Sequence, residues 1–203
     1  MPILTGIKIY EMEPEIHILK TEILSKNWYT LKKVSYEYRK KDGKLQVQQR
    51  EAYDRGNGAV ILLYSRERKT VILTRQFRLP TYINGNETGM LIEACAGLLD
   101  KDNPEECIIR ETEEETGYKI SRAEKVFEAY MSPGSVTEIL YFFIAEYAPY
   151  MKLHEGGGVE HEQEDIEVLE IEFEKAIWMV EHSEIKDAKT IMLLQYLQLK
   201  HLL

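Results

Sequence analysis

The sequence predicts a domain in which β-strands mix with few helices, of the α+β or sandwiched α/β/α class, preceded by a small antiparallel β domain. The segment before about residue 55 contains only strand patterns, and from Gly58 onward strands alternate with helical segments. The 203 residues suffice for one substantial core and a small additional domain. We therefore expect domains at residues 1–55 and 56–203.

The first domain is predicted to be a short antiparallel sheet. His17 to Leu24, Trp28 to Arg39 and Leu45 to Tyr53 are rich in β-branched and aromatic residues, and Lys41-Asp42-Gly43 signals a turn. A sheet of this size does not bury its own apolar residues, so it must pack on something else. A partner subunit is one candidate.

The second domain begins with two compact apolar strands, Ala59 to Tyr64 and Thr70 to Arg75. Met90 to Cys95 is a further predicted strand, and Ala96-Gly97 is predicted to open a loop. The other predicted elements are a helix from Pro104 to Thr116 between an N-cap at Asn103 and a C-cap at Gly117, strands near Lys125 to Met131, Ile139 to Tyr147 and Ile166 to Phe173, and helices at about Phe173 to His182 and Ala188 to Leu203.

The charge of the chain bears on its partners. The formal net charge is -9, and no run of Lys and Arg offsets it, which disfavours binding to nucleic acid or anionic lipid. No apolar stretch approaches the roughly 18 residues that a membrane span needs. Cys95 and Cys107 lack metal-binding spacing and are typical of buried, reduced thiols. We therefore expect a cytoplasmic protein that binds neither nucleic acid nor membrane.

The predicted helix from Pro104 to Thr116 carries three close glutamates. At 100° per residue, Glu111, Glu114 and Glu115 lie within about 100° of one another. Such like-charge pairs cost roughly 0.2–0.5 kcal/mol each, and they lie at the unfavourable end of the helix dipole. Carboxylate oxygens are hard ligands suited to Mg²⁺ or Mn²⁺, which would turn the repulsion into coordination. For three glutamates alone, a solvated acidic face is the alternative.

These glutamates belong to a wider motif. Gly97 and the run from Arg110 to Tyr118, RETEEETGY, resemble the Nudix box, which pairs a glycine with a downstream Arg-Glu-U-x-Glu-Glu-x-Gly-U, where U is bulky and apolar. Twelve residues separate Gly97 from Arg110, one fewer than in the general pattern. The isolated upstream glutamate of the box is missing, with Asp102 or Asn103 near its place. The ligand-bearing part of the motif is complete.

The resemblance extends over most of the chain. It is closest to the Nudix hydrolases that cleave GDP-mannose, and ADP-ribose pyrophosphatases share the same layout. The segments that carry it are 53–59 (YDRGNGA), 75–78 (RQFR), 84–87 (NGNE), 93–100 (EACAGLLD), 130–134 (YMSPG) and 156–160 (GGGVE).

This resemblance implies the Nudix fold, an α/β/α sandwich, and metal-dependent hydrolysis of the diphosphate of a nucleotide sugar. GDP-mannose would give GMP and mannose 1-phosphate, with Mg²⁺ as the cofactor and Mn²⁺ as a substitute. ADP-ribose, giving AMP and ribose 5-phosphate, is the alternative substrate. A sensor that binds a nucleotide sugar without cleaving it is a further alternative.

The resemblance also implies the metal ligands. The carbonyl of Ala96 and the carboxylates of Glu111 and Glu115 would bind the metals, with Glu114 beside them and Glu115 also catalytic. Arg110 would orient these carboxylates by a bidentate pair.

The loop from His154 to Asp165 is predicted to be a mobile acidic lid, because three glycines precede a group of acidic residues. The resemblance implies that one glutamate of this loop reaches the metals and deprotonates or positions the attacking water. Alignment on Asp165-Ile166-Glu167 selects Glu164, and Glu162 is the alternative.

Substrate contacts are implied in both domains. Arg78 would grip the diphosphate, and Trp28 would stack on the purine from the N-terminal sheet of the other subunit of a homodimer. Plain core packing is the alternative for Trp28. The remaining implied contacts are Gln49, Arg50 and Glu51 in the nucleotide pocket, Gly97 and Leu98 at the box, and Glu138 and Lys189 near the sugar.

Overall fold

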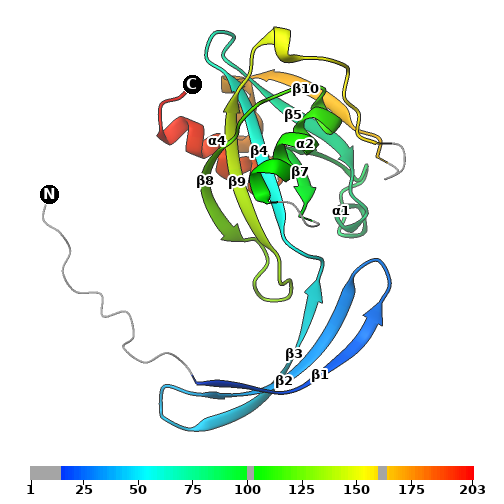
Figure 1. Cartoon of the computed structure of the whole chain (residues 1–203), viewed down its shortest axis with the longest axis vertical. Helices are drawn as coiled ribbons and strands as arrows, with labels where there is room; N and C mark the ends of the chain where they lie inside the picture. The colour runs from blue at the N-terminus through cyan, green and yellow to red at the C-terminus, as the bar shows by residue number, and fades with distance from the viewer. Residues whose placement is uncertain (1–14, 100–102, 160–163) are drawn as a thin grey trace, which may run out of the picture. The chain divides into compact units, whose positions relative to one another are not determined.

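The computed structural model describes residues 15–99, 103–159 and 164–203, which form two compact units (Figure 1). The first unit holds the described residues before Gly56 together with Gly134–Thr137. The second unit holds the described residues of Gly56–Pro133 and Glu138–Leu203.

The first unit is a three-stranded antiparallel sheet in the order β1-β2-β3, as predicted. Its strands are β1 (Ile16–Lys26), β2 (Thr30–Arg39) and β3 (Leu45–Asp54). The segment 134–137 belongs to this unit because the Tyr53 amide donates to the Ser135 carbonyl at 2.7 Å and the Thr137 amide donates to the Tyr53 carbonyl at 3.1 Å.

The second unit is built on a mixed seven-stranded sheet whose main path is β10-β5-β4-β9-β8, while β6 pairs with β5 and β7 pairs with β4. The central strand β4 is buried along its whole length and runs parallel to β9 but antiparallel to β5 and β7. The strands are β4 (Gly58–Ser65), β5 (Thr70–Phe77), β6 (Met90–Glu93), β7 (Cys95–Leu98), β8 (Glu124–Tyr130), β9 (Ile139–Glu146) and β10 (Glu167–Glu172).

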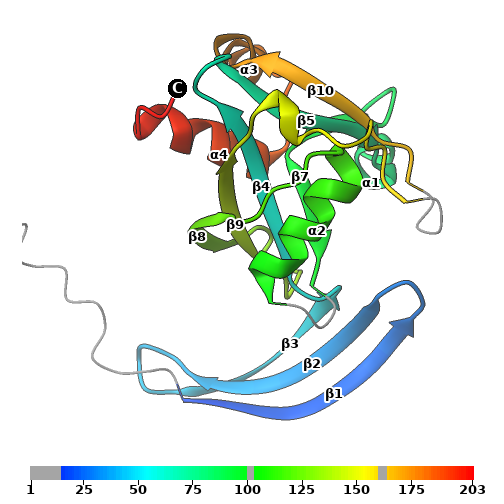
Figure 2. The ribbon, with the colours of Figure 1, turned by 45° about the horizontal axis from the view of Figure 1, so that its top comes forward.

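Helices cover both faces of this sheet (Figure 2). Alternate residues of β4 point to opposite faces, because side chains alternate along a strand. Ala59, Ile61 and Leu63 share a core with Ile108 of α2 (Pro104–Thr116). Val60, Leu62 and Tyr64 share the other core with α3 (Phe173–Glu181) and α4 (Ala188–Leu199). The α/β/α sandwich is therefore confirmed. None of the helices in the described part of the chain is long and apolar enough to cross a membrane.

One local expectation was wrong, and one short helix was not predicted. Ala96 and Gly97 do not open a loop but lie in β7, where Ala96 is opposite Val60 of β4. Glycine occurs at sites of close packing as well as in turns, and Gly97 is such a packing site, because a methyl group there would overlap the Glu111 side chain. The five-residue helix α1 (Leu79–Ile83) was not expected at all, since it is too short to show a helical period.

The ends of α2 agree with the predicted caps. The Asn103 side chain accepts hydrogen bonds from the amides of Glu105 and Glu106, both at 3.0 Å. Gly117 ends the helix in the left-handed region at φ 76°, and its amide donates to the Glu113 carbonyl at 2.9 Å. A methyl group at Gly117 would overlap the carbonyl of His154, so both the conformation and the space require glycine.

Gly117→Ala should therefore lower the free energy of unfolding by at least about 1–2 kcal/mol, the cost of a left-handed alanine, with the overlap adding to it. Chemical denaturation followed by circular dichroism measures this. Gly134→Ala is the control, because an added methyl group there meets no atom within 4 Å. Equal stability losses in the two variants would contradict the explanation.

Candidate active site

Three predicted residues form one ionic group on α2. The Nη1 atom of Arg110 donates to Glu114 Oε2 at 2.8 Å, and its Nη2 atom lies 3.0 Å from Glu111 Oε1. The guanidinium thus bridges two carboxylates, with a different nitrogen on each. This arrangement neutralises part of the repulsion between the two glutamates and orients both of them.

Glu115 lies deeper than its neighbours. It is 2% exposed, and its Oε2 atom accepts a hydrogen bond from the Ala96 amide of β7 at 3.3 Å. Burial raises the pKa of Glu115 to about 8; a hydrogen bond from Cys95 acts in the opposite direction, while the charges of Glu164 and Glu111 raise it further. In the absence of a cation, a proton therefore occupies this carboxyl group at neutral pH.

The packing of α2 on β7 produces this burial. Gly97 has no side chain, so the Glu111 carboxylate lies directly against the strand, and the Glu111 side chain is only 13% exposed. The backbone of Ala96, predicted to supply a ligand carbonyl, is therefore brought to the same place as Glu111 and Glu115.

The glycines of the predicted lid are attached to the C-terminal end of α2. The Gly157 amide donates to the Glu115 carbonyl at 2.9 Å, and the Gly158 amide donates to the Glu114 carbonyl at 3.2 Å. Gly156, Gly157 and Gly158 have φ values of 73°, 109° and 82°, which favour glycine. Gly157 and Gly158 thus cap the ligand helix, a function that the sequence did not reveal.

Glu164, one of the two predicted lid bases, lies close enough to Glu115 for its charge to affect the pKa of Glu115. The Glu164 Oε2 atom accepts a hydrogen bond from the Val159 amide at 3.1 Å, and the Glu164 charge is one of the causes that raise the pKa of Glu115. The rival, Glu162, lies outside the described residues.

The described residues do not hold three His, Cys, Asp or Glu side chains already gathered around one point for a metal ion. Arg110 engages Glu111 and Glu114, and the Ala96 amide engages Glu115. The donor set nevertheless fits a divalent cation: it consists of hard oxygens, and a cation would favour the charged form of a carboxyl group whose pKa is raised by burial and by neighbouring acids.

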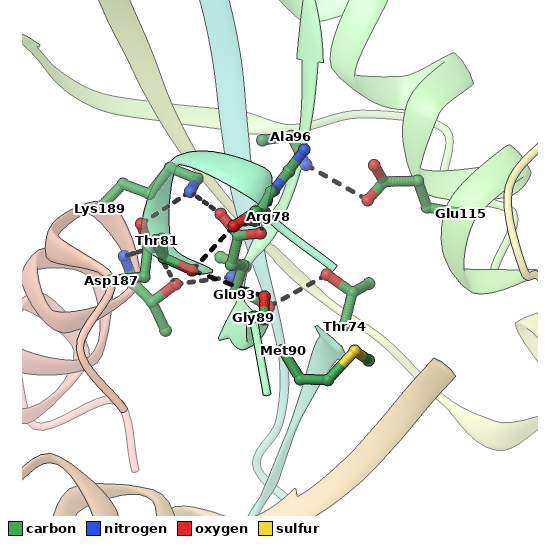
Figure 3. Close-up of polar contacts among 12 residues, drawn as sticks. Thr74, Arg78, Thr81, Gly89, Met90, Glu93, Ala96, Glu115, Asp187 and Lys189 are labelled. Carbon is green, nitrogen blue, oxygen red and sulfur yellow. Dashed lines mark hydrogen bonds and ion pairs between the residues drawn. The ribbon is translucent and has the colours of Figure 1, made fainter. Parts of the chain in front are cut away.

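A second polar cluster surrounds the buried carboxylate of Glu93, which is 3% exposed (Figure 3). Its Oε2 atom accepts from Arg78 Nε at 2.6 Å, and its Oε1 atom accepts from Lys189 Nζ at 2.5 Å. Lys189 Nζ also donates to Asp187 Oδ1 at 2.7 Å. Glu93 and Asp187 were not singled out from the sequence. A charged residue within an otherwise apolar strand was the signal that could have identified Glu93.

The charges of this cluster stabilise one another. Burial by itself would raise the pKa of Glu93, but the positive charges of Lys189 and Arg78 outweigh it and lower that pKa. Burial would likewise lower the pKa of Lys189, and the charges of Glu93 and Asp187 raise it. Glu93, Lys189 and Arg78 are therefore ionised at neutral pH.

The remaining predicted residues are divided between the units. Leu98 lies in β7 opposite Gly58, and Glu138, which is 8% exposed, lies beside Gly58. Trp28 is 83% exposed, so packing against the described residues of its own unit does not explain it. With Trp28, the residues Gln49, Arg50 and Glu51 belong to the first unit, and their contact with a substrate stays a prediction.

Comparison with known proteins agrees with this geometry. The domain family described as "NUDIX domain" matches residues 54–191, and "GDP-mannose pyrophosphatase NudK N-terminal domain" matches residues 15–53. The chain therefore belongs to the NUDIX family. It is 54% identical over 192 residues to the GDP-mannose pyrophosphatases of Shigella dysenteriae serotype 1 (strain Sd197) and Escherichia coli O157:H7, an alignment that covers 95% of this chain and 100% of each relative.

The raised pKa of Glu115 predicts how metal-free stability depends on pH. The carboxyl group has an ordinary pKa of 4.5 in the unfolded chain and a pKa of about 8 in the folded protein. Its contribution to the free energy of unfolding is therefore complete below pH 4.5 and is lost as the pH rises through about 8. Glu115→Gln removes this loss, so the Tm of the variant should gain on the wild type by at least a few degrees between about pH 6 and about pH 9 in EDTA.

Added Mg²⁺ should raise the Tm of the wild type more than that of Glu115→Gln. The control is Glu113→Gln on the same helix, because Glu113 pairs with Lys119 outside the ionic group. The assignment of Glu115 would be wrong if Glu113→Gln and Glu115→Gln shared one pH profile.

Proposed function

We propose that this chain hydrolyses GDP-mannose to GMP and mannose 1-phosphate, with Mg²⁺ as its cofactor and Mn²⁺ as a substitute. The observation that carries this proposal is the buried carboxyl group of Glu115, which lies among other acids and has its pKa raised to about 8. The full-length similarity to proteins named GDP-mannose pyrophosphatase supports the choice of substrate.

The proposed ligands are the Ala96 carbonyl, Glu111, Glu115 and Glu164, with Glu114 beside them. Bound Mg²⁺ would neutralise the diphosphate and lower the pKa of the attacking water. Arg110 keeps Glu111 and Glu114 in place through its bridge. The water oxygen adds to one phosphorus, the bond from that phosphorus to the bridging oxygen breaks, and the proton leaves with the lid glutamate.

The substrate would contact residues of both units. Arg78 binds the diphosphate, Gly97 and Leu98 line the site, and Glu138 and Lys189 act near the sugar. Trp28 stacks on the purine, and Gln49, Arg50 and Glu51 surround the nucleotide, from the partner subunit of a homodimer. The strongly exposed Trp28 ring supports a role outside the core of its own unit.

The exposed apolar residues of the first unit support the homodimer. Ile18 is 62% exposed, Ile23 is 62% exposed and Val47 is 59% exposed, and the described residues of this unit form no second layer that covers them. Two buried free cysteines, Cys95 and Cys107, suit the reducing cytoplasm that we propose as the location.

The reaction is tested with a panel of GDP-mannose, ADP-ribose and other sugar nucleotides in Mg²⁺, with both products measured. We expect the highest kcat/KM with GDP-mannose. Loss of the general base should lower kcat by about 10²–10⁴-fold. This loss is expected for Glu164→Gln, whereas Glu162→Gln should stay near the wild type.

The outcomes of this panel separate the alternatives. A higher kcat/KM for ADP-ribose would mean that ADP-ribose, and not GDP-mannose, is the substrate. A larger fall in kcat for Glu162→Gln than for Glu164→Gln would identify Glu162 as the general base. Tight binding of sugar nucleotides without any product would indicate a sensor and overturn the proposal.

The homodimer is tested by light scattering after size-exclusion chromatography. Ile18→Glu places a charge on the exposed apolar sheet and should shift the protein from dimer to monomer. Leu199→Glu is the matched control, because Leu199 is 77% exposed on α4 in the second unit. A wild-type monomer, or equal effects of the two changes, would contradict this interface.

A further inference from the structure

A closed ring of polar contacts joins the end of β6 to the first turn of α4, and Figure 3 labels three of its members, Glu93, Asp187 and Lys189. The Ala94 amide donates to Thr190 Oγ1 at 2.6 Å, and Thr190 Oγ1 donates to Asp187 Oδ2 at 2.5 Å. Lys189 Nζ then connects Asp187 Oδ1 to Glu93 Oε1. Because Glu93 directly precedes Ala94 in the chain, the ring closes. We call these five residues the polar ring.

The polar ring fixes the Glu93 carboxylate and leaves its second oxygen directed at Arg78. Glu93 Oε2 accepts from Arg78 Nε at 2.6 Å, and the Glu93 side chain is only 4% exposed. A carboxylate held at one oxygen by a buried lysine has little freedom to rotate. The position of its other oxygen is therefore defined by the fold.

The backbone of Arg78 is fixed as well. Its amide donates to the Gly89 carbonyl at 2.8 Å, and its own carbonyl accepts from the Thr81 amide at 3.0 Å as α1 begins. A methyl group at Gly89 would overlap the Phe77 ring, so this close approach requires glycine. With both backbone and Nε held, the guanidinium plane of Arg78 has one preferred orientation.

This orientation suits an anion at the outer edge of the guanidinium. An arginine has five N–H donors in one plane, and engagement of Nε leaves the Nη1 and Nη2 edge for a bidentate contact. The Arg78 side chain is 39% exposed, and Arg78 and Glu115 are close enough that the charge of each affects the pKa of the other. The exposed edge of Arg78 therefore belongs to the same site as the ligand helix.

We propose that Glu93 is a positioning residue, which uses the polar ring to orient the Arg78 guanidinium toward the substrate diphosphate. The proposal rests on the proposed function of Arg78 and adds Glu93, Asp187 and Thr190 to the residues on which that function depends. Glu93 itself does not touch the substrate. A purely structural role, in which Glu93 only attaches α4 to the sheet, is the competing explanation.

A double-mutant cycle separates the two explanations. Glu93→Gln keeps the shape of the side chain but removes the charge that holds Arg78, and we expect kcat/KM for GDP-mannose to fall about 10–100-fold, mainly through KM. Arg78→Lys keeps the positive charge but has no fork to orient. In the Arg78→Lys background, Glu93→Gln should therefore change kcat/KM by less than about twofold.

Two further variants keep the test decisive. Asp187→Asn retains an oxygen to cap α4 but weakens the hold on Lys189, so a smaller fall in kcat/KM, again absent with Arg78→Lys, is expected even if Glu93→Gln does not fold. Glu170→Gln is the control, because Glu170 accepts from Arg68 Nε at 2.6 Å in a separate ion pair. It should lower the Tm and leave KM unchanged.

The outcomes are distinct. If Glu93→Gln and Asp187→Asn reduce kcat/KM by the same factors in both backgrounds, the positioning role is overturned while the proposed function stands. If Arg78→Lys alone leaves kcat/KM unchanged, the diphosphate role of Arg78 fails, and the positioning role fails with it. A wild-type protein that cleaves no sugar nucleotide refutes the proposed function before the cycle begins.

Discussion

The contact between α2 and β7 brings Glu111 and Glu115 against the strand and buries Glu115 away from water. Gly97 lets the helix approach until the Glu111 side chain lies on the strand, and Glu115 is then buried against the Ala96 amide. Burial and the neighbouring acids disfavour the charged form of Glu115, which is why its pKa is raised. The arrangement is stable when charged only if a cation compensates it, so packing and chemistry depend on the same contact.

The rest of the site is arranged around the C-terminal end of this helix. The last carbonyl groups of a helix lack intrahelical partners, and the amides of Gly157 and Gly158 supply them here. The Val159 amide, next to these glycines, donates to Glu164 Oε2, and the charge of Glu164 helps to raise the pKa of Glu115. The described residues Gly157 to Val159 therefore both complete the helix and bind the Glu164 carboxylate, which links the stability of α2 to the composition of the site.

The cluster around Glu93 shows a different solution to the burial of charge. Glu115 lies among like charges, whereas Glu93 lies between Arg78 and Lys189 and remains ionised. The two buried carboxyl groups, Glu93 and Glu115, thus differ in protonation because the charges around them differ in sign. The Arg78 side chain lies between these two environments, and its charge affects both carboxyl groups.

Local signals in the sequence determined the three-stranded sheet, the limits of α2 and the group of glutamates, because strand alternation, helix caps and residue spacing act over a few positions. These signals left the α+β and α/β/α classes open, and the resemblance to the Nudix hydrolases selected the sandwich. Only the tertiary structure revealed three other features: the strand at Ala96 and Gly97, the capping of α2 by Gly157 and Gly158, and the pairing of Glu93 with Lys189. Each depends on segments far apart in sequence, 96 residues in the case of Glu93 and Lys189, and no local pattern encodes such a contact.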